Sequence, residues 1–237
     1  MSQIFDSPLC HNSHKDNYIV LSKTSFQKEI AMNLFTLDNL FLLLTGLTAL
    51  YLLWRFYTRW SKGKALYDVY YMMGFLVLLV SGLLLIFLGL GILSSPYVLT
   101  VASLIPLGIS MGLVEQYFPQ WKKAFKWFAL IGFLAIAVTS IGGMDALKKI
   151  AVPLFHGVAG LVIFIGPFIA KGAAKGFWWV GIGGLLIGLG GIALAFISLG
   201  SQLLFFSPQF VMTILTPLLF LMTLAFTFGF VKEIVRR

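Results

Sequence analysis

Two long stretches of this chain, residues 69–114 and residues 176–231, contain no Asp, Glu, Lys, Arg or His. Each stretch has room for two helices of about 20 residues, the length that crosses a hydrocarbon core of about 30 Å. In lipid, backbone N–H and C=O groups must pair within the protein, so a spanning segment is a helix or part of a closed barrel. Barrel strands alternate apolar and polar residues, whereas these stretches are apolar on every face. The sequence therefore predicts an all-α fold, a polytopic transmembrane helical bundle.

The pattern of apolar residues predicts about seven spans. The residues before 39 differ, because they are polar and lack the apolar core of a signal peptide. We therefore divide the chain into a polar N-terminal tail, residues 1–38, and a transmembrane domain, residues 39–237. Met32 lies just before the first span, so the upstream residues are either a disordered tail or an over-called one that precedes the true start. The predicted spans cover residues 39–60, 70–93, 96–118, 125–144, 150–170, 177–199 and 209–231.

Basic residues indicate the orientation of these spans. With the N-terminus outside, the cytoplasmic segments carry twelve Lys and Arg residues, the outer loops carry two, and the tail adds three outside. Cytoplasmic loops of membrane proteins are enriched in Lys and Arg, which predicts an N-out, C-in topology. The Trp residues agree, since indole prefers the headgroup boundary and all six lie at predicted cytoplasmic ends. They are Trp54, Trp60, Trp121, Trp127, Trp178 and Trp179.

The formal net charge of +9 does not point to nucleic acid, because the basic residues lie in short loops between apolar spans and not in one domain. A metal site is not expected either. Cys10, His11 and His14 are possible donors in the tail, but structural zinc sites take four ligands from two separated pairs, and the chain has no second pair.

An internal repeat is a further hypothesis. "SPYVLTVASLIPLGISM" begins at Ser95 and "SPQFVMTILTPLLFLMT" begins at Ser207, an offset of 112 residues, and each carries a second Pro near its middle. "FLLLTGL" from Phe41 aligns with "FHGVAGL" from Phe155 at an offset of 114. Either the chain contains a parallel 3+1+3 repeat, as is known among transporters, or two Leu- and Gly-rich segments align by composition alone. The 3+1+3 outline is similar to that of the SWEET sugar transporters and implies a small permease. The Pro-Gln pairs at 119–120 and 208–209 lie at span ends, so we assign no family.

His156 is the clearest ionisable group within a span. Such groups are costly in lipid and are functional candidates for that reason. The imidazole could ligate a metal or a tetrapyrrole cofactor, or relay a proton; alternatively, it is a neutral imidazole bonded to a neighbouring helix.

Four other positions bear on function or packing. Glu115 near a predicted cytoplasmic end either pairs with a nearby Lys or gates a cytoplasmic mouth. Pro106 and Pro217 lie within spans, where each removes a helical hydrogen bond and favours a kink that shapes packing or lines a cavity. Gly184 and Gly188 form a G-x-x-x-G spacing, which lets another helix backbone approach closely.

The sequence contains none of the common catalytic motifs, such as HExxH or a P-loop, so no catalytic residue is assigned and an enzymatic activity is not favoured. Two classes of function remain. The first is a non-catalytic membrane subunit or scaffold that packs against other membrane proteins, lipids or pigments. The second is a small permease or transporter with the 3+1+3 layout. Either class places the chain in a membrane as a multi-pass protein, with lipids and other membrane subunits as its expected partners.

Overall fold

The computed structural model describes residues 36–198 and 208–236, and the side chains of 192–198 and 208–209 are not part of that description. The chain divides into two units, Met1–Leu40 and Phe41–Arg237, and the packing described below is that of the second unit. All regular secondary structure in the described residues is helical, which confirms the all-α prediction. The predicted tail falls almost entirely outside the described residues.

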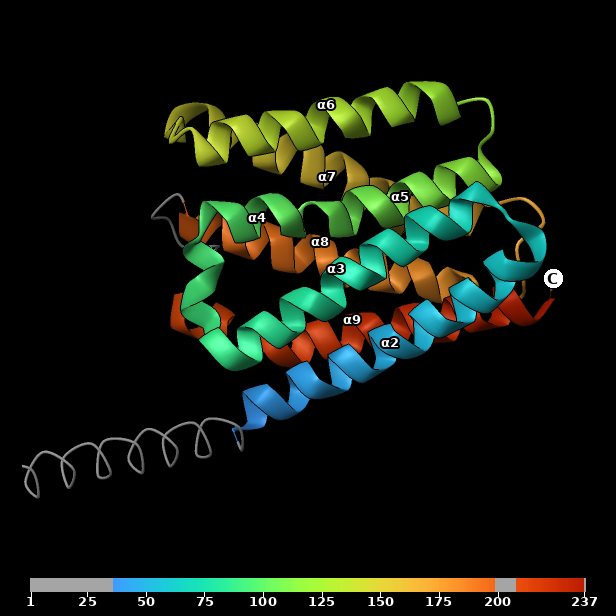
Figure 1. Cartoon of the computed structure of the whole chain (residues 1–237), viewed down its shortest axis with the longest axis horizontal. Helices are drawn as coiled ribbons and strands as arrows, with labels where there is room; N and C mark the ends of the chain where they lie inside the picture. Colours follow the sequence, from blue (N-terminus) through green and yellow to red (C-terminus); the bar gives the residue numbers. More distant parts are fainter. Residues whose placement is uncertain (1–35, 199–207, 237) are drawn as a thin grey trace, which may run out of the picture. The chain divides into compact units, whose positions relative to one another are not determined.

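Successive helices run in opposite directions across the bundle (Figure 1). The turns that follow α2, α5 and α7 therefore lie at the same end as the C-terminus, and the turns that follow α3 and α6 lie at the other. The elements are α2 (Leu37–Gly63), α3 (Leu66–Leu88), the 3-10 helix η1 (Leu90–Ser94), α4 (Pro96–Ala102), α5 (Leu104–Tyr117), α6 (Lys122–Ile141), α7 (Asp145–Ile169), α8 (Trp178–Ser198) and α9 (Pro208–Arg236).

Six helical segments of the described chain are long and apolar enough to cross a membrane. They are Leu37–Gly63, Leu66–Leu88, Pro96–Tyr117, Lys122–Ile141, Asp145–Ile169 and Phe210–Arg236. The predicted span at 177–199 corresponds to α8. The part of α8 whose side chains are described, Trp178–Gly191, is an apolar helix too short to join that group. The protein is thus a multi-pass helical membrane protein by length and composition.

The helical pass from Pro96 to Tyr117 is divided into α4 and α5 at Ser103, but the backbone of Ser103 stays right-handed helical (φ −61°, ψ −22°) and the two helices form one span. Pro106 follows three residues later, and its ring clashes with the carbonyl four residues before it, at the end of α4. The hydroxyl of Ser103 donates a 2.7 Å hydrogen bond to the carbonyl oxygen of Thr100, in the preceding turn. Pro217, in contrast, lies inside the continuous helix α9.

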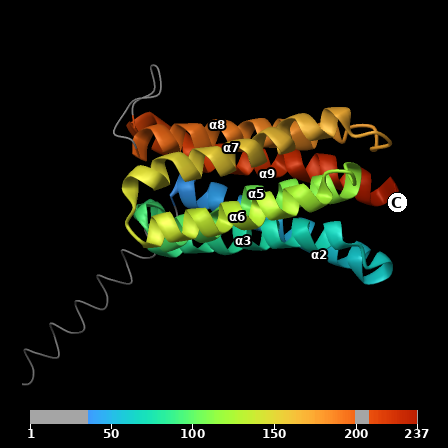
Figure 2. The same ribbon diagram turned by 90° about the horizontal axis from the view of Figure 1, so that it is seen from above.

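The core is centred on α5 and α9. Figure 2 shows these two helices between α7 and α8 on one side and α2 and α3 on the other. About three fifths of the Pro96–Tyr117 span is buried (61%), against 44% of the α9 span and 28–33% of the other spans. A group of stacked and edge-on rings fills the space between α2, α3 and α9; its fully buried members are Phe56, Tyr71, Phe75, Phe226 and Phe230.

Glycines permit the closest helix contacts. Gly74 of α3 faces Gly108 of α5, and a Cβ on Gly108 would lie 3.0 Å from the carbonyl oxygen of Tyr70. Gly184 of α8 lies against the backbone of α7, where a Cβ would come within 2.6 Å of the carbonyl carbon of Ile163. A side chain larger than hydrogen would push these helix pairs apart.

Candidate functional site: a buried polar cluster at the basic end

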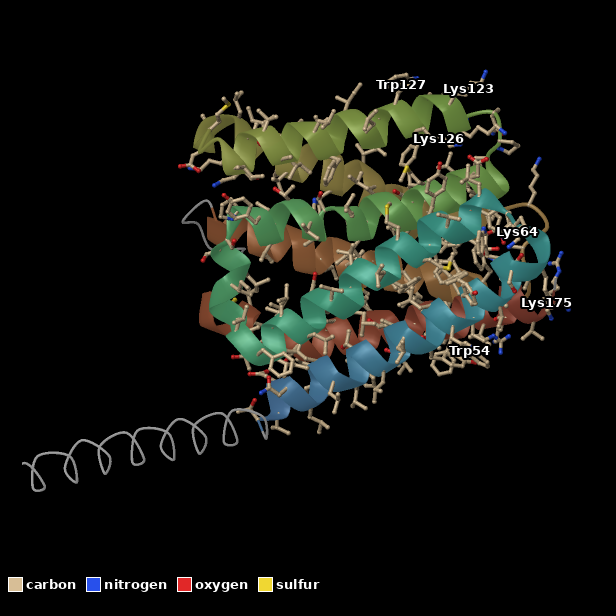
Figure 3. The ribbon with its side chains drawn as sticks, in the orientation of Figure 1. Trp54, Lys64, Lys123, Lys126, Trp127 and Lys175 are labelled. Carbon is tan, nitrogen blue, oxygen red and sulfur yellow. The ribbon has the colours of Figure 1, made fainter. Side chains whose placement is uncertain are left out.

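The end of the bundle that carries the C-terminus is also the end where basic residues gather. Figure 3 shows Lys64, Lys123, Lys126 and Lys175 there, on the turns and helix ends that topology brings together. Beneath this basic surface, Asp68 and Glu233 are fully buried (0% exposed). A buried carboxylate is costly unless donors of the protein compensate for its lost hydration. Both Asp68 and Glu233 have such donors.

Asp68 lies in the first turn of α3 and forms an ion pair with Arg59 of α2. The Nε atom of Arg59 donates a 2.8 Å hydrogen bond to Oδ1 of Asp68, and Nη2 donates to the same oxygen. The guanidinium carbon also lies 5.4 Å from the ring centre of Phe56 and 5.1 Å from that of Tyr67, within range of cation–π attraction. The pair fastens the two helices just beside the two-residue turn that joins them.

Glu233 lies near the end of α9 and binds two other parts of the chain. Its Oε2 atom accepts a 2.7 Å hydrogen bond from the backbone N–H of Ala174, in the segment between α7 and α8. Its Oε1 atom accepts a longer hydrogen bond of 3.4 Å from Nε2 of Gln116 at the end of α5. One carboxylate therefore connects three segments that lie far apart in the sequence.

Gln116 extends these contacts to α3. Its Oε1 atom accepts a 2.9 Å hydrogen bond from the hydroxyl of Tyr71, and its Nε2 atom lies 3.1 Å from the hydroxyl oxygen of Tyr117. We refer to these side chains together as the polar cluster. It consists of Arg59, Asp68, Tyr71, Gln116, Tyr117 and Glu233.

The polar cluster sits directly on the aromatic core. The ring of Tyr71 lies 5.0 Å from that of Phe56 and 4.8 Å from that of Phe230, measured between ring centres. Gly112 makes room for the same ring, because a Cβ there would lie only 2.4 Å from it. Since the rings exclude water from the inner side, the hydrogen bonds of the cluster operate in a medium of low dielectric constant and are strengthened by it.

These groups hold neighbouring helix ends together through hydrogen bonds and an ion pair. Both buried carboxylates accept hydrogen bonds from donors of this chain. Within the described residues, no group of three or more His, Cys, Asp or Glu side chains is arranged to hold a metal ion. The polar cluster joins the ends of α2, α3, α5 and α9 and the α7–α8 connection into one unit.

Glu115 precedes Gln116 on α5 but belongs to a different set of contacts. Its carboxylate forms an ion pair with Lys126 of α6 at 2.8 Å and a longer one with Lys122 at 3.8 Å. Its side chain is 14% exposed, so the pair lies at the border of the bundle. Its proposed gating role stays a prediction.

His156 lies on α7, away from the polar cluster. Its Nδ1 atom is buried and has no hydrogen-bond partner in the described part of the chain. Among the described residues, this nitrogen therefore has no partner on a neighbouring helix. Cofactor ligation by His156 stays a prediction.

The remaining predicted positions are dispersed. Pro106 follows the division between α4 and α5, and Pro217 lies in the middle of α9. Gly184 contacts the backbone of α7, whereas a Cβ on Gly188 would meet nothing within 4 Å. The structure thus brings none of the predicted site residues together, and it assembles the polar cluster from residues that the sequence left unassigned.

Helix periodicity is the signal by which three of these residues could have been found. Asp68, Tyr71 and Phe75 are spaced by three and four residues, and so share one face of α3. Phe226, Phe230 and Glu233 continue one face of α9 in the same way. Gln116 carries no such signal, because α5 is buried on most of its surface.

No protein-family model matches this chain, and no curated protein or solved structure gives a significant match. What the chain does is therefore inferred from its own geometry, namely the polar cluster and the apolar surfaces of the bundle.

Proposed function

We propose that this multi-pass helical membrane protein is a non-catalytic subunit or scaffold that packs against other membrane proteins and lipids. The observation that supports the proposal is how the Ser and Thr hydroxyl groups of the described helices form hydrogen bonds. Most of them donate to a carbonyl of their own helix and so do not offer a donor to a solute. Examples are Thr45 to Phe41, Ser110 to Pro106, Thr139 to Ala135 and Thr223 to Leu219, at 2.7–2.8 Å.

The outer faces of the helices suit such a role. On α6, a row of large apolar side chains at helical spacing is exposed, and each residue is about half exposed or more. In a bilayer, such a face contacts either lipid or the transmembrane helix of another protein. The row consists of Trp127, Leu130, Ile131, Leu134 and Val138.

A photo-crosslinking scan tests the proposal. A photoreactive amino acid is placed in turn at Ile131 and Leu134 of α6 and at Leu43 and Leu47 of α2, all exposed positions, and membranes are irradiated before solubilisation. We expect a protein adduct of one discrete mass from one helix face and lipid adducts from the other. Lipid adducts alone at every position would contradict a subunit or scaffold role.

The N-out, C-in topology is part of the same proposal. It is supported by the gathering of Lys64, Lys123, Lys126 and Lys175 at the end that carries the C-terminus (Figure 3), because Lys and Arg favour the cytoplasmic side. The parallel repeat is a weaker element. It is supported by Pro96 and Pro208, which both stand at the first position of a helix.

A small permease is the second candidate, and one observation favours it. The most buried helical pass carries Pro106, which removes one helical hydrogen bond, and a helix distorted in this way can line a solute site. If this is the function, purified protein in phosphatidylcholine vesicles will accelerate the entry of small polar solutes, and Pro106→Ala will slow that entry. Vesicles that are no more permeable than protein-free ones would exclude it.

A further inference from the structure

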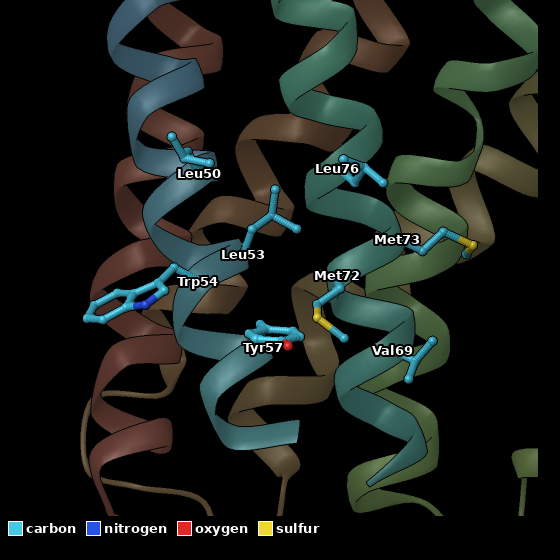
Figure 4. Close-up of a pocket in the computed structure, with 8 residues that line it drawn as sticks. All are labelled: Leu50, Leu53, Trp54, Tyr57, Val69, Met72, Met73 and Leu76. Atoms are coloured by element: carbon cyan, nitrogen blue, oxygen red, sulfur yellow. The ribbon is translucent and has the colours of Figure 1, made fainter. Parts of the chain in front are cut away.

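A groove of about 540 Å³ runs between α2 and α3 on the surface of the bundle (Figure 4). Its walls are apolar apart from the hydroxyl of Tyr57, and the ring of Trp54 points away from α3 (Figure 4). Those two side chains are each 56% exposed, and Leu76 across the groove is 52% exposed. In a helical membrane protein, an open groove of this kind faces lipid. The lining residues are Leu50, Leu53, Trp54, Tyr57, Val69, Met72, Met73 and Leu76.

One end of the groove approaches the basic turn between α2 and α3. Tyr57 and Val69 line that end (Figure 4), the exposed residues Ser61 and Lys62 follow in the last turn of α2, and Lys64 lies in the connection to α3. The Nζ atom of Lys64 lies 4.0 Å from the ring centre of Trp60, which holds the ammonium group beside the interface. Arg59 does not contribute to this rim, since its charge is engaged by Asp68. The groove thus approaches a helix end that carries two exposed lysines, Lys62 and Lys64.

We propose that this groove binds an anionic glycerophospholipid, with one acyl chain along α2 and α3 and the phosphate held by Lys62 and Lys64. The charge of the rim distinguishes this occupant from a second copy of the chain. Two copies in one membrane share the same orientation, so a symmetric contact through the groove would bring two sets of Lys62 and Lys64 together and repel. An anionic headgroup is instead attracted to them.

Met72 and Met73 fit the same occupant. Both line the groove, and their unbranched thioether chains adapt to a flexible partner more readily than branched side chains do. The inference concerns a site that the scaffold proposal does not include. It holds or fails independently of whether other proteins bind the bundle.

Fluorescence quenching tests the proposal on the full chain. The protein is reconstituted in phosphatidylcholine vesicles that contain, at equal mole fraction, acyl-brominated phosphatidylglycerol or acyl-brominated phosphatidylcholine. The difference between Tyr57→Trp and the native chain isolates the emission of an indole at position 57, whose ring lies between α2 and α3 (Figure 4). We expect the anionic lipid to quench this component by at least a factor of about five more, the factor that each of the two basic residues near an anionic headgroup provides.

The double variant Lys62→Gln/Lys64→Gln should remove that preference. The matched control is Lys123→Gln/Lys175→Gln, which makes the same change of charge on two exposed lysines at the same end but on other turns. The control should keep the preference. Native mass spectrometry of the same variants, with unmodified phosphatidylglycerol, should show retained lipid for the native chain and the control only.

Three results would overturn the proposal. Equal quenching by the two brominated lipids would mean that the groove holds bulk lipid without selection. An anionic preference that is lost equally in both double variants would place the effect in the net charge of that end. Protection of the indole at position 57 from both lipids, together with a dimeric mass, would identify a second copy as the occupant.

Discussion

Glu233, near the end of α9, accepts a 2.7 Å hydrogen bond from the backbone N–H of Ala174, 59 residues earlier in the chain. Both residues are buried, and the contact ties the last helix to the segment between α7 and α8. Through Gln116, the same carboxylate is also connected to α5 and to Tyr71 of α3. The C-terminal turn of the protein is therefore a structural part of the bundle.

Replacing Glu233 tests how much that attachment contributes. In Glu233→Gln the side chain keeps its shape but loses its charge, so the hydrogen bond from Ala174 weakens. We expect a loss of about 1.5–3 kcal/mol in the free energy of unfolding, the usual contribution of a hydrogen bond to a charged group. Thermal unfolding in detergent micelles measures it. Asp145→Asn is the control, because that carboxylate is 72% exposed and solvent screens its pair with Lys148. Equal losses in the two variants would contradict the role given to Glu233.

The ion pair between Arg59 and Asp68 leads to a second prediction. Asp68→Asn leaves a guanidinium buried without its counter-charge, and we expect a destabilisation of about 3–5 kcal/mol. The double variant Arg59→Met/Asp68→Leu removes both charges and should be less destabilised than the single variant. A double variant that unfolds at a lower temperature than Asp68→Asn would show that the pair is net stabilising beyond the removal of an orphan charge.

Much of the fold could be predicted because hydropathy is summed over about 20 residues, so single errors average out. The predicted span at 96–118 coincides with the pass Pro96–Tyr117, and the span at 39–60 lies within α2. Pro106 was expected to distort that helix, and the division between α4 and α5 falls three residues before it, at Ser103. A hydropathy window detects the length of an apolar segment but does not detect a missing backbone hydrogen bond within it.

The candidate site was missed for a related physical reason. Hydropathy assigns charged residues to loops, and the predicted spans at 70–93 and 209–231 therefore excluded Asp68 and Glu233. In the structure, α3 begins at Leu66 and α9 ends at Arg236, so both carboxylates are helical and buried. Their burial depends on donors supplied by Arg59 and by the backbone of Ala174. Such partners are set by tertiary packing and are invisible to a local pattern.

Two glycines of α8 provide a matched pair of substitutions. A Cβ on Gly184 would lie 2.6 Å from backbone atoms of Ile163 and Phe164, whereas one on Gly188 would meet nothing within 4 Å. Gly184→Ala should therefore force α7 and α8 apart and lower the unfolding temperature. Gly188→Ala should be neutral, or stabilising by up to about 1 kcal/mol, since Ala favours helix over Gly. Thermal unfolding of the two variants side by side measures the difference, and a reversed order would contradict the packing of α7 on α8.

The proposed topology makes a prediction about chemical access. Cys10 is the only cysteine, so Cys10→Ser provides a background in which single cysteines can be introduced. Lys64→Cys lies on the basic turn after α2, and Lys149→Cys lies in the first turns of α7 at the opposite end; both native side chains are exposed. Since basic ends favour the cytoplasm, a membrane-impermeant maleimide should label Lys149→Cys in intact cells and Lys64→Cys only after permeabilisation. Labelling of Lys64→Cys from outside would show that the bundle has the opposite orientation. The basic rim of the groove would then lie at the outer leaflet.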